Sequence, residues 1–159
     1  MPILSSLVRA ALFVSDLERS ERLYRDVLGL EESYARNALQ NAEFAALLGV
    51  PAAAAIRYSI LKMPGPARGM IGLFEVRDPA PPVLRREPGQ CNVGEVALVF
   101  YTDDLEHYRQ RLEDFGIRYV CRPLVLSVRP GQANLEMTFR DPDGVMINIL
   151  QKDPLDLDA

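Results

Sequence analysis

The chain carries one sequence pattern twice, and this duplication constrains the fold more than any other feature. Asp16-Leu17-Glu18 recurs as Asp104-Leu105-Glu106 about half a chain length later, and Gly29-Leu30 recurs as Gly116-Ile117. A self-match at this spacing indicates two copies of one supersecondary unit. We therefore expect a pseudo-twofold molecule whose functional surface lies where the two copies meet.

Each copy predicts the order strand, helix, strand, strand, strand. Asp16 and Asp104 are suitable helix N-caps, and the glycines Gly29 and Gly116 are suitable helix ends. In the first copy we expect strands at 6–14, 30–36, 54–63 and 69–76, a helix after Asp16 and a short helix at 40–49. In the second copy we expect strands at 94–102, 117–122, 133–140 and 145–151, and a helix at 104–114.

Two further segments of the second copy have predicted conformations. Residues 124–132 are expected to form a mobile loop. Asp141-Pro142-Asp143-Gly144 favours a type I turn, because proline stands second and glycine fourth. If that turn closes a regular hairpin, Met137 and Phe139 share a sheet face with Asn148.

The prolines and the charged end of the chain predict its boundaries. The first module is expected at 1–76, a surface linker at 77–92, the second module at 93–152 and an acidic tail at 153–159. The predicted fold class is therefore α+β, with two tandem βαβββ modules.

Composition excludes several classes of partner. The net charge is −4 and no basic block is present, which argues against nucleic acid as a partner. No apolar run approaches the roughly 20 residues of a membrane span, and residues 1–14 do not read as a signal peptide. Cys91 and Cys121 form no CxxC motif, which indicates reduced thiols. We expect a cytoplasmic protein that binds no nucleic acid and no membrane.

Each copy opens with a strand, the pattern Val/Thr-x-Asp-Leu, a helix and a glycine, and the second copy closes with Asp141-Pro142-Asp143-Gly144. This arrangement resembles the vicinal oxygen chelate superfamily. That superfamily includes glyoxalase I, the bleomycin-resistance proteins and the extradiol dioxygenases. The resemblance covers nearly the whole chain. It implies that the sheets curve into a shared mixed-sheet cup with the helices outside, and that the protein is a homodimer.

Metal-using members of that superfamily place one ligand, usually His, Gln or Glu, on the first and last strands of each module. This chain has Arg9, Gly72, Ala97 and Asn148 at those positions. Glycine and alanine supply no side-chain ligand, arginine repels a cation, and asparagine is a weak neutral ligand. The only histidine, His107, falls in the second helix. We therefore expect no metal and no cofactor.

Strand alternation predicts which side chains line the cup. The expected lining is Arg9, Phe13, Tyr58, Met70, Gly72, Phe74, Glu95, Ala97, Tyr101, Phe139 and Asn148. These residues form an apolar and aromatic surface with one cation, one anion and one amide. Such a surface suits a small organic molecule with an apolar or aromatic body and an anionic or carbonyl handle.

Three functions follow from this lining. We favour a metal-free small-molecule-binding protein, because the cup offers no nucleophile–base pair. The alternative is a metal-independent isomerase, cyclase or lyase with Glu95 as the base and Arg9 as the oxyanion stabiliser. A metal-dependent glyoxalase-like lyase or dioxygenase disagrees with the four ligand positions. Arg9 has two open roles: it contacts the ligand, or it forms a buried ion pair with Glu95.

Overall fold

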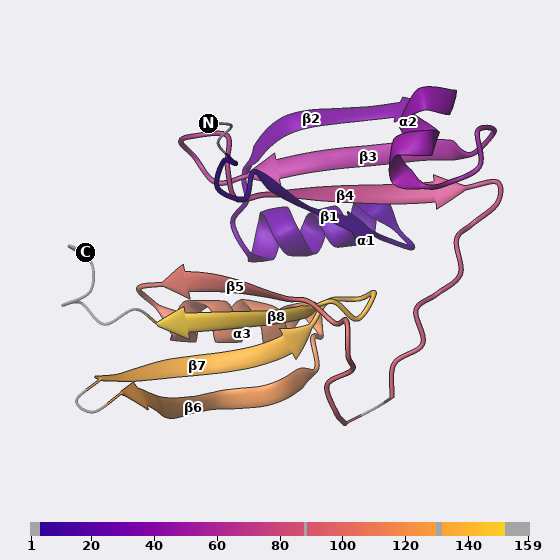
Figure 1. The fold of residues 1–159 in the computed structure, drawn as a ribbon. Coiled ribbons are helices and arrows are strands. Elements are labelled where there is room, and N and C mark those ends of the chain that lie inside the picture. Colours follow the sequence, from indigo (N-terminus) through magenta and orange to yellow (C-terminus); the bar gives the residue numbers. More distant parts are fainter. Residues whose placement is uncertain (1–3, 88, 130–131, 152–159) are drawn as a thin grey trace. The chain divides into compact units, whose positions relative to one another are not determined.

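The computed structural model describes residues 4–87, 89–129 and 132–151, so the expected tail at 153–159 lies outside the described residues. The chain divides into two compact units, Met1–Leu84 and Arg85–Ala159. Each unit contains one four-stranded mixed sheet (Figure 1). The α+β class and the tandem βαβββ order are confirmed. Among the described residues, no helix is long and apolar enough to cross a bilayer.

Unit 1 carries one helix more than the βαβββ pattern requires. Its elements are β1 (Arg9–Phe13), α1 (Leu17–Glu21), β2 (Glu32–Leu39), α2 (Ala42–Leu48), β3 (Ala55–Lys62) and β4 (Met70–Arg77). The helix α1 continues as a π-helical segment, Arg22–Val27. The sheet order is β1-β4-β3-β2, with β1 parallel to β4 and the other pairs antiparallel.

Unit 2 repeats this topology without a counterpart of α2. Its elements are β5 (Ala97–Thr102), α3 (Leu105–Phe115), β6 (Tyr119–Arg129), β7 (Gln132–Arg140) and β8 (Met146–Gln151). The sheet order is β5-β8-β7-β6, with β5 parallel to β8. The repeat extends to the helix caps, because the carboxylates of Asp16 and Asp104 each accept a backbone N–H three residues on, at 2.9 and 3.0 Å.

Each main helix covers one face of its own sheet. Leu17, Leu23 and Tyr24 of the first helical segment are at most 1% exposed, and α1 packs over β3 and β4. Leu105 and Leu112 of α3 are equally buried and pack over β8. The face of each sheet opposite this helix carries most of the predicted site residues.

The strand β6 is longer than the sequence predicted. The expected mobile loop at 124–132 was wrong for its first part, because β6 continues to Arg129 and pairs with β7 through Val125–Leu135 and Ser127–Ala133. The run Leu124-Val125-Leu126 favours extended backbone. Pro123 does not oppose this, since β6 is the outermost strand of its sheet and proline is tolerated there.

The β7–β8 hairpin differs from the prediction by one residue. Asp141 N donates to Val145 O at 2.9 Å, and Gly144 N donates to Asp141 O at 3.0 Å. The loop therefore has three residues, and its last, Gly144, has a φ of 88° that favours glycine. Thr138 pairs with Asn148 in this register. A shift of one residue moves every side chain of β7 to the other face of the sheet.

Candidate functional site

Six predicted site residues share one face of the unit 1 sheet, which we call the unit 1 face. Arg9 pairs with Met70 and Phe13 pairs with Phe74 across β1 and β4. Tyr58 pairs with Phe74 across β3 and β4, which places it on this same face. The six predicted residues of the unit 1 face are Arg9, Phe13, Tyr58, Met70, Gly72 and Phe74.

Aromatic side chains fill the centre of the unit 1 face. The ring centroid of Phe74 lies 5.9 Å from that of Tyr58, 6.2 Å from that of Phe44 and 6.3 Å from that of Phe13. Phe44 belongs to α2, which begins at the N-cap Asn41 and packs on this face. As a result Phe74 is only 2% exposed, whereas Phe13 at the margin is 45% exposed.

Arg9 lies over Gly72 at the edge of the aromatic cluster. A Cβ atom added at Gly72 would stand 2.9 Å from Arg9 Cδ and 2.8 Å from Phe74 Cε2, so these two side chains occupy the space above the glycine. The guanidinium carbon of Arg9 is 6.0 Å from the Phe74 ring centroid, within cation–π range. Arg9 is exposed and, in the part of the chain that the structure describes, no carboxylate forms an ion pair with it.

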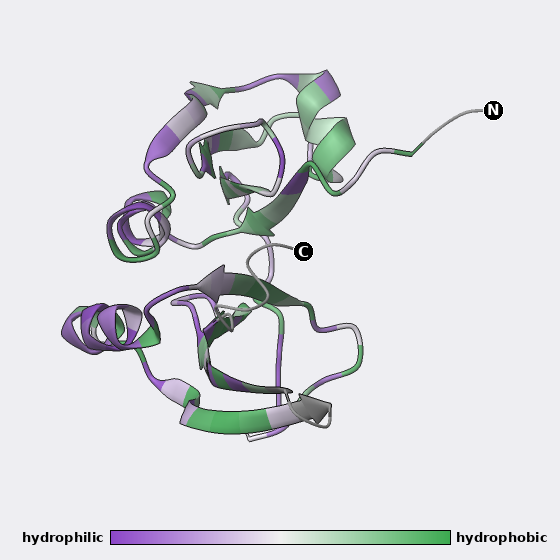
Figure 2. Ribbon diagram, turned by 90° about the vertical axis from the view of Figure 1, so that its left-hand side faces the viewer, coloured by the Kyte–Doolittle hydropathy of each residue, from purple (hydrophilic) through white to green (hydrophobic). Residues whose placement is uncertain are grey.

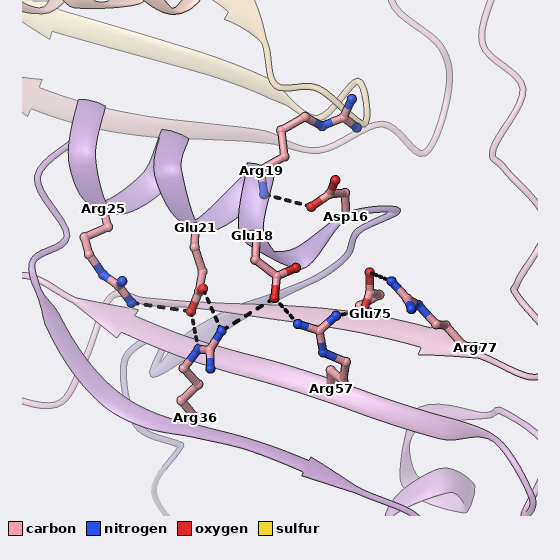
Figure 3. A network of polar contacts seen from close by, with 9 residues as sticks. All are labelled: Asp16, Glu18, Arg19, Glu21, Arg25, Arg36, Arg57, Glu75 and Arg77. Atoms are coloured by element: carbon pink, nitrogen blue, oxygen red, sulfur yellow. Dashed lines mark hydrogen bonds and ion pairs between the residues drawn. The ribbon is translucent and has the colours of Figure 1, made fainter.

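The opposite face of the unit 1 sheet holds a network of ion pairs beneath α1 (Figure 3). Glu75 is 2% exposed and accepts hydrogen bonds from Arg57 at 2.8 Å and Arg77 at 2.9 Å. Arg57 also pairs with Glu18 on α1. This network fastens the helix to the sheet, and it places Arg57 on the face away from Tyr58.

A second carboxylate of the network, Glu21, faces β2 (Figure 3). Arg36 donates to it at 3.0 and 3.2 Å, and Arg25 donates at 3.4 Å. Burial acts to raise the pKa of Glu21, but the hydrogen bonds and charges around it prevail and the pKa is lowered. The carboxylate therefore stays ionised and paired at neutral pH.

The unit 2 sheet presents a different surface, which we call the unit 2 face. Ala97 and Tyr101 of β5 lie on it with Asn148 of β8, as the registers Ala97–Met146 and Tyr101–Leu150 require. Val99 and Tyr101 are 60% and 69% exposed. From β7 this face receives Glu136, Thr138 and Arg140, which pair with Leu150, Asn148 and Met146.

Asn148 is the centre of a polar cluster on the unit 2 face. Its Nδ2 donates to Thr138 Oγ1 at 3.1 Å, to Met137 O at 3.3 Å and to Glu136 Oε2 at 3.4 Å. Sequence reasoning missed Glu136 and Thr138 because it assumed the other hairpin register. The available signal was Gly144, whose position favours a three-residue loop over a four-residue turn.

Phe139 was placed on the wrong face by the same assumption. It pairs with Ile147, and both side chains are fully buried on the side of the sheet that α3 covers. Its predicted role in ligand binding is therefore withdrawn.

Glu95 lies before β5 and is held by two arginines of its own unit. Its Oε1 pairs with Arg140 and, at 3.0 Å, with Arg86 Nε, while its Oε2 accepts the backbone N–H of Asn92 at 3.0 Å. Arg86 falls within the expected linker, yet it also donates to Asp143 O at 3.2 Å. Within unit 2, the carboxylate of Glu95 therefore has two cationic partners and a backbone donor.

These contacts make Glu95 a poor general base. The hydrogen bond from Arg140 and the backbone N–H of Asn92 lower the pKa of Glu95 to about 2. A base for neutral solution needs a pKa near the working pH. The role of Glu95 as the catalytic base, which the sequence suggested, therefore has no support in this geometry.

Comparison with known proteins agrees with the observed topology. A model of the Glyoxalase/Bleomycin resistance protein/Dioxygenase superfamily matches residues 6–149. The chain belongs to this superfamily. No curated protein matches it.

Several solved structures share the fold of this superfamily member. A glyoxalase family protein from Bacillus cereus has a TM-score of 0.77 at 14% identity, with 95% of each chain covered. A glyoxylase/bleomycin resistance protein/dioxygenase domain from a Frankia species has a TM-score of 0.63 at 20% identity, with 95% of this chain and 100% of that chain covered. TnmS3, an antibiotic-binding protein from a Streptomyces species, has a TM-score of 0.58 at 18% identity, with 96% of this chain and 100% of that chain covered.

The residues of this superfamily member do not fit the metal site of its metal-using relatives. By the resemblance seen in the sequence, the expected ligand positions are Arg9 and Gly72 in unit 1, and Ala97 and Asn148 in unit 2. Within the described ranges, no three His, Cys, Asp or Glu side chains form a group that could hold a metal ion. Among these four side chains, a divalent ion finds one neutral amide and no imidazole or carboxylate.

Proposed function

We propose that this protein binds a small organic molecule without a metal ion. The ligand has an apolar or aromatic body and an anionic or carbonyl handle. Arg9 carries this proposal: it is an exposed guanidinium resting on Phe74, without a carboxylate partner among the described residues. A cation left without an anion beside an aromatic surface is suited to a ligand that supplies both the charge and the apolar contact.

The aromatic cluster supports an aromatic body for the ligand. Phe13 is half exposed beside the buried Phe74, so a flat molecule gains apolar contact at the margin of the unit 1 face. The fold relative TnmS3 is an antibiotic-binding protein, which agrees with a binding role for this architecture.

We further propose that the protein is a homodimer. The strand β6 is outermost in its sheet, and it exposes Val120, Val125 and Leu126 at 45% or more. Figure 2 shows the hydrophobic middle of β6 at the lower margin of unit 2. An exposed apolar edge strand is normally covered, and a second copy is the simplest cover. Light scattering at micromolar concentration tests this, and Val125→Glu should shift the protein to monomers.

The ligand proposal is tested with anilinonaphthalene sulfonate, a fluorescent probe with an aromatic body and an anionic handle. Arg9→Ala should weaken binding by about 1.5–3 kcal/mol, or more than about tenfold in Kd, the range expected for losing a charge-assisted hydrogen bond. Arg22→Ala is the matched control, because Arg22 is an exposed arginine of the helical segment in the same unit. Its Kd should equal that of the wild type.

Thermal melts must accompany these titrations to show that both variants are folded. Equal probe affinity in Arg9→Ala and the wild type would contradict the assignment of Arg9 to ligand binding. Failure of the probe to bind the folded wild type at all would contradict the proposed function itself.

A further inference from the structure

Glu136 is an acid in the middle of an apolar row on the unit 2 face. The strand registers place Tyr101, Leu150, Glu136 and Leu124 next to one another across β5, β8, β7 and β6. Tyr101 and Leu124 are 69% and 43% exposed, while Glu136 is half-buried. Neighbouring strands are about 4.8 Å apart, so one small molecule can contact several residues of this row together.

Glu136 also differs from Glu95, another carboxylate of unit 2. Glu95 is matched by Arg86 and Arg140. Among the described residues no cation forms an ion pair with Glu136, and its carboxylate accepts a long 3.4 Å hydrogen bond from Asn148 Nδ2. Arg140, which shares the unit 2 face, is taken by Glu95 and Gly144 O.

Among the described residues, the hydrogen bond that Glu136 receives is weak. Asn148 Nδ2 shares its two hydrogens among Glu136, Met137 O and Thr138 Oγ1, and the amide oxygen of Asn148 keeps its capacity to accept. The ring of Tyr101 offers a π face that attracts cations. A carboxylate, an amide oxygen and an aromatic ring on an apolar surface together favour a cationic donor group.

We propose that the unit 2 face binds the ammonium group of a small organic amine with an apolar body. Glu136 pairs with the ammonium group, and Tyr101, Leu150 and Leu124 contact the apolar body. This inference concerns unit 2 and requires neither Arg9 nor the unit 1 face. It therefore goes beyond the proposed function, which concerns an anionic or carbonyl handle.

The test uses dansylcadaverine, a fluorescent primary amine, and its N-acetylated derivative, which has the same apolar body without the charge. The wild type should bind the amine at least about tenfold more tightly than the acetylated probe at low salt. Glu136→Gln should abolish this preference, because it removes the charge and keeps the shape. Raising the salt concentration should weaken the binding of the amine and leave the binding of the acetylated probe unchanged.

Asp114→Asn is the matched control, because it removes one exposed carboxylate from α3 on the other side of the unit 2 sheet. This variant should keep the full preference for the amine. Equal affinity of the wild type for the two probes, or an unchanged preference in Glu136→Gln, would overturn the inference. The wild-type comparison decides the matter even if Glu136→Gln does not fold. Because the Arg9 test uses an anionic probe and a different variant, each proposal can fail alone.

Discussion

The strands β4 and β8 occupy the same position in two sheets of the same topology, yet they are buried differently. In β4, every residue from Met70 to Val76 is buried, so both faces of the strand are covered. In β8, Ile147 and Ile149 are buried under α3, while Met146, Asn148 and Leu150 on the unit 2 face are only half-buried. The two modules share one backbone frame and present two different surfaces.

The cause of this difference lies in one inserted element and one side chain. In unit 1, α2 brings Phe44 onto Phe74 and Tyr58, and Arg9 covers Gly72. The described residues of unit 2 include no helix between β6 and β7, and Ala97 stands at the position of Arg9. A connection between two strands can therefore change a sheet face from open to closed without altering the sheet.

The largest expected effect compares the centres of the two faces. Phe74→Ala should lower the free energy of unfolding by about 3–5 kcal/mol, because it opens a cavity among buried rings. Leu150→Ala, at the equivalent position of β8, should cost about 1 kcal/mol, since its side chain is already half exposed. Urea denaturation followed by circular dichroism measures both. Equal losses would show that the unit 2 face is covered as completely as the unit 1 face.

The next comparison concerns the helix-covered faces. Arg57→Ala leaves the buried Glu75 with Arg77 alone and should cost about 2–3 kcal/mol. Arg109→Ala in α3 removes pairs with Glu106 and Glu113, which are 68% and 37% exposed, and should cost about 1 kcal/mol or less. A loss in Arg109→Ala as large as that in Arg57→Ala would contradict the buried role assigned to the unit 1 network.

A smaller effect is expected from adding carbon atoms to each face. Gly72→Ala places a Cβ atom against the Phe74 ring and the Arg9 side chain, and should cost about 1–2 kcal/mol. Ala97→Val on the exposed strand β5 should change stability by no more than about 0.5 kcal/mol. Thermal unfolding of the two variants shows whether only the unit 1 face is closed.

The smallest effect is a dependence on pH in unit 2. Because the folded-state pKa of Glu95 is about 2, below its ordinary 4.5, its contribution to stability is complete above about pH 4.5 and is lost as pH falls towards 2. Glu95→Gln should remove this part of the acid sensitivity, which thermal melts between pH 2 and 7 would record. If the melting temperature of Glu95→Gln fell with pH as much as that of the wild type, Arg140 and Arg86 would not hold this carboxylate.

Local sequence signals predicted the frame of the molecule. The caps Asp16 and Asp104, the glycine Gly116 that ends α3 and the apolar periodicity between them were enough to give the order of elements. The strand alternation of β1 and β4 also placed Arg9 and Phe74 on one face. These features depend on residues close together in the chain, where spacing alone decides the geometry.

Features that depend on exact register or distant packing were missed. The half of the site on β7 was reversed because Asp141 pairs with Val145 and not with Gly144, the last residue of the expected turn. The partners of Glu95 come from Arg86 and Arg140, which no short-range pattern connects. Phe44 reaches Phe74 only because α2 folds back over the sheet.

The central claim is that this protein binds an organic ligand without a metal ion. The direct test is a titration of the wild type with anilinonaphthalene sulfonate before and after exhaustive chelation, with the metal content of the same samples measured by mass spectrometry. We predict substoichiometric metal and one Kd in both samples, because Arg9, Gly72, Ala97 and Asn148 supply no suitable ligand set. A stoichiometric transition metal whose removal abolishes probe binding, and whose return restores it, would contradict the account.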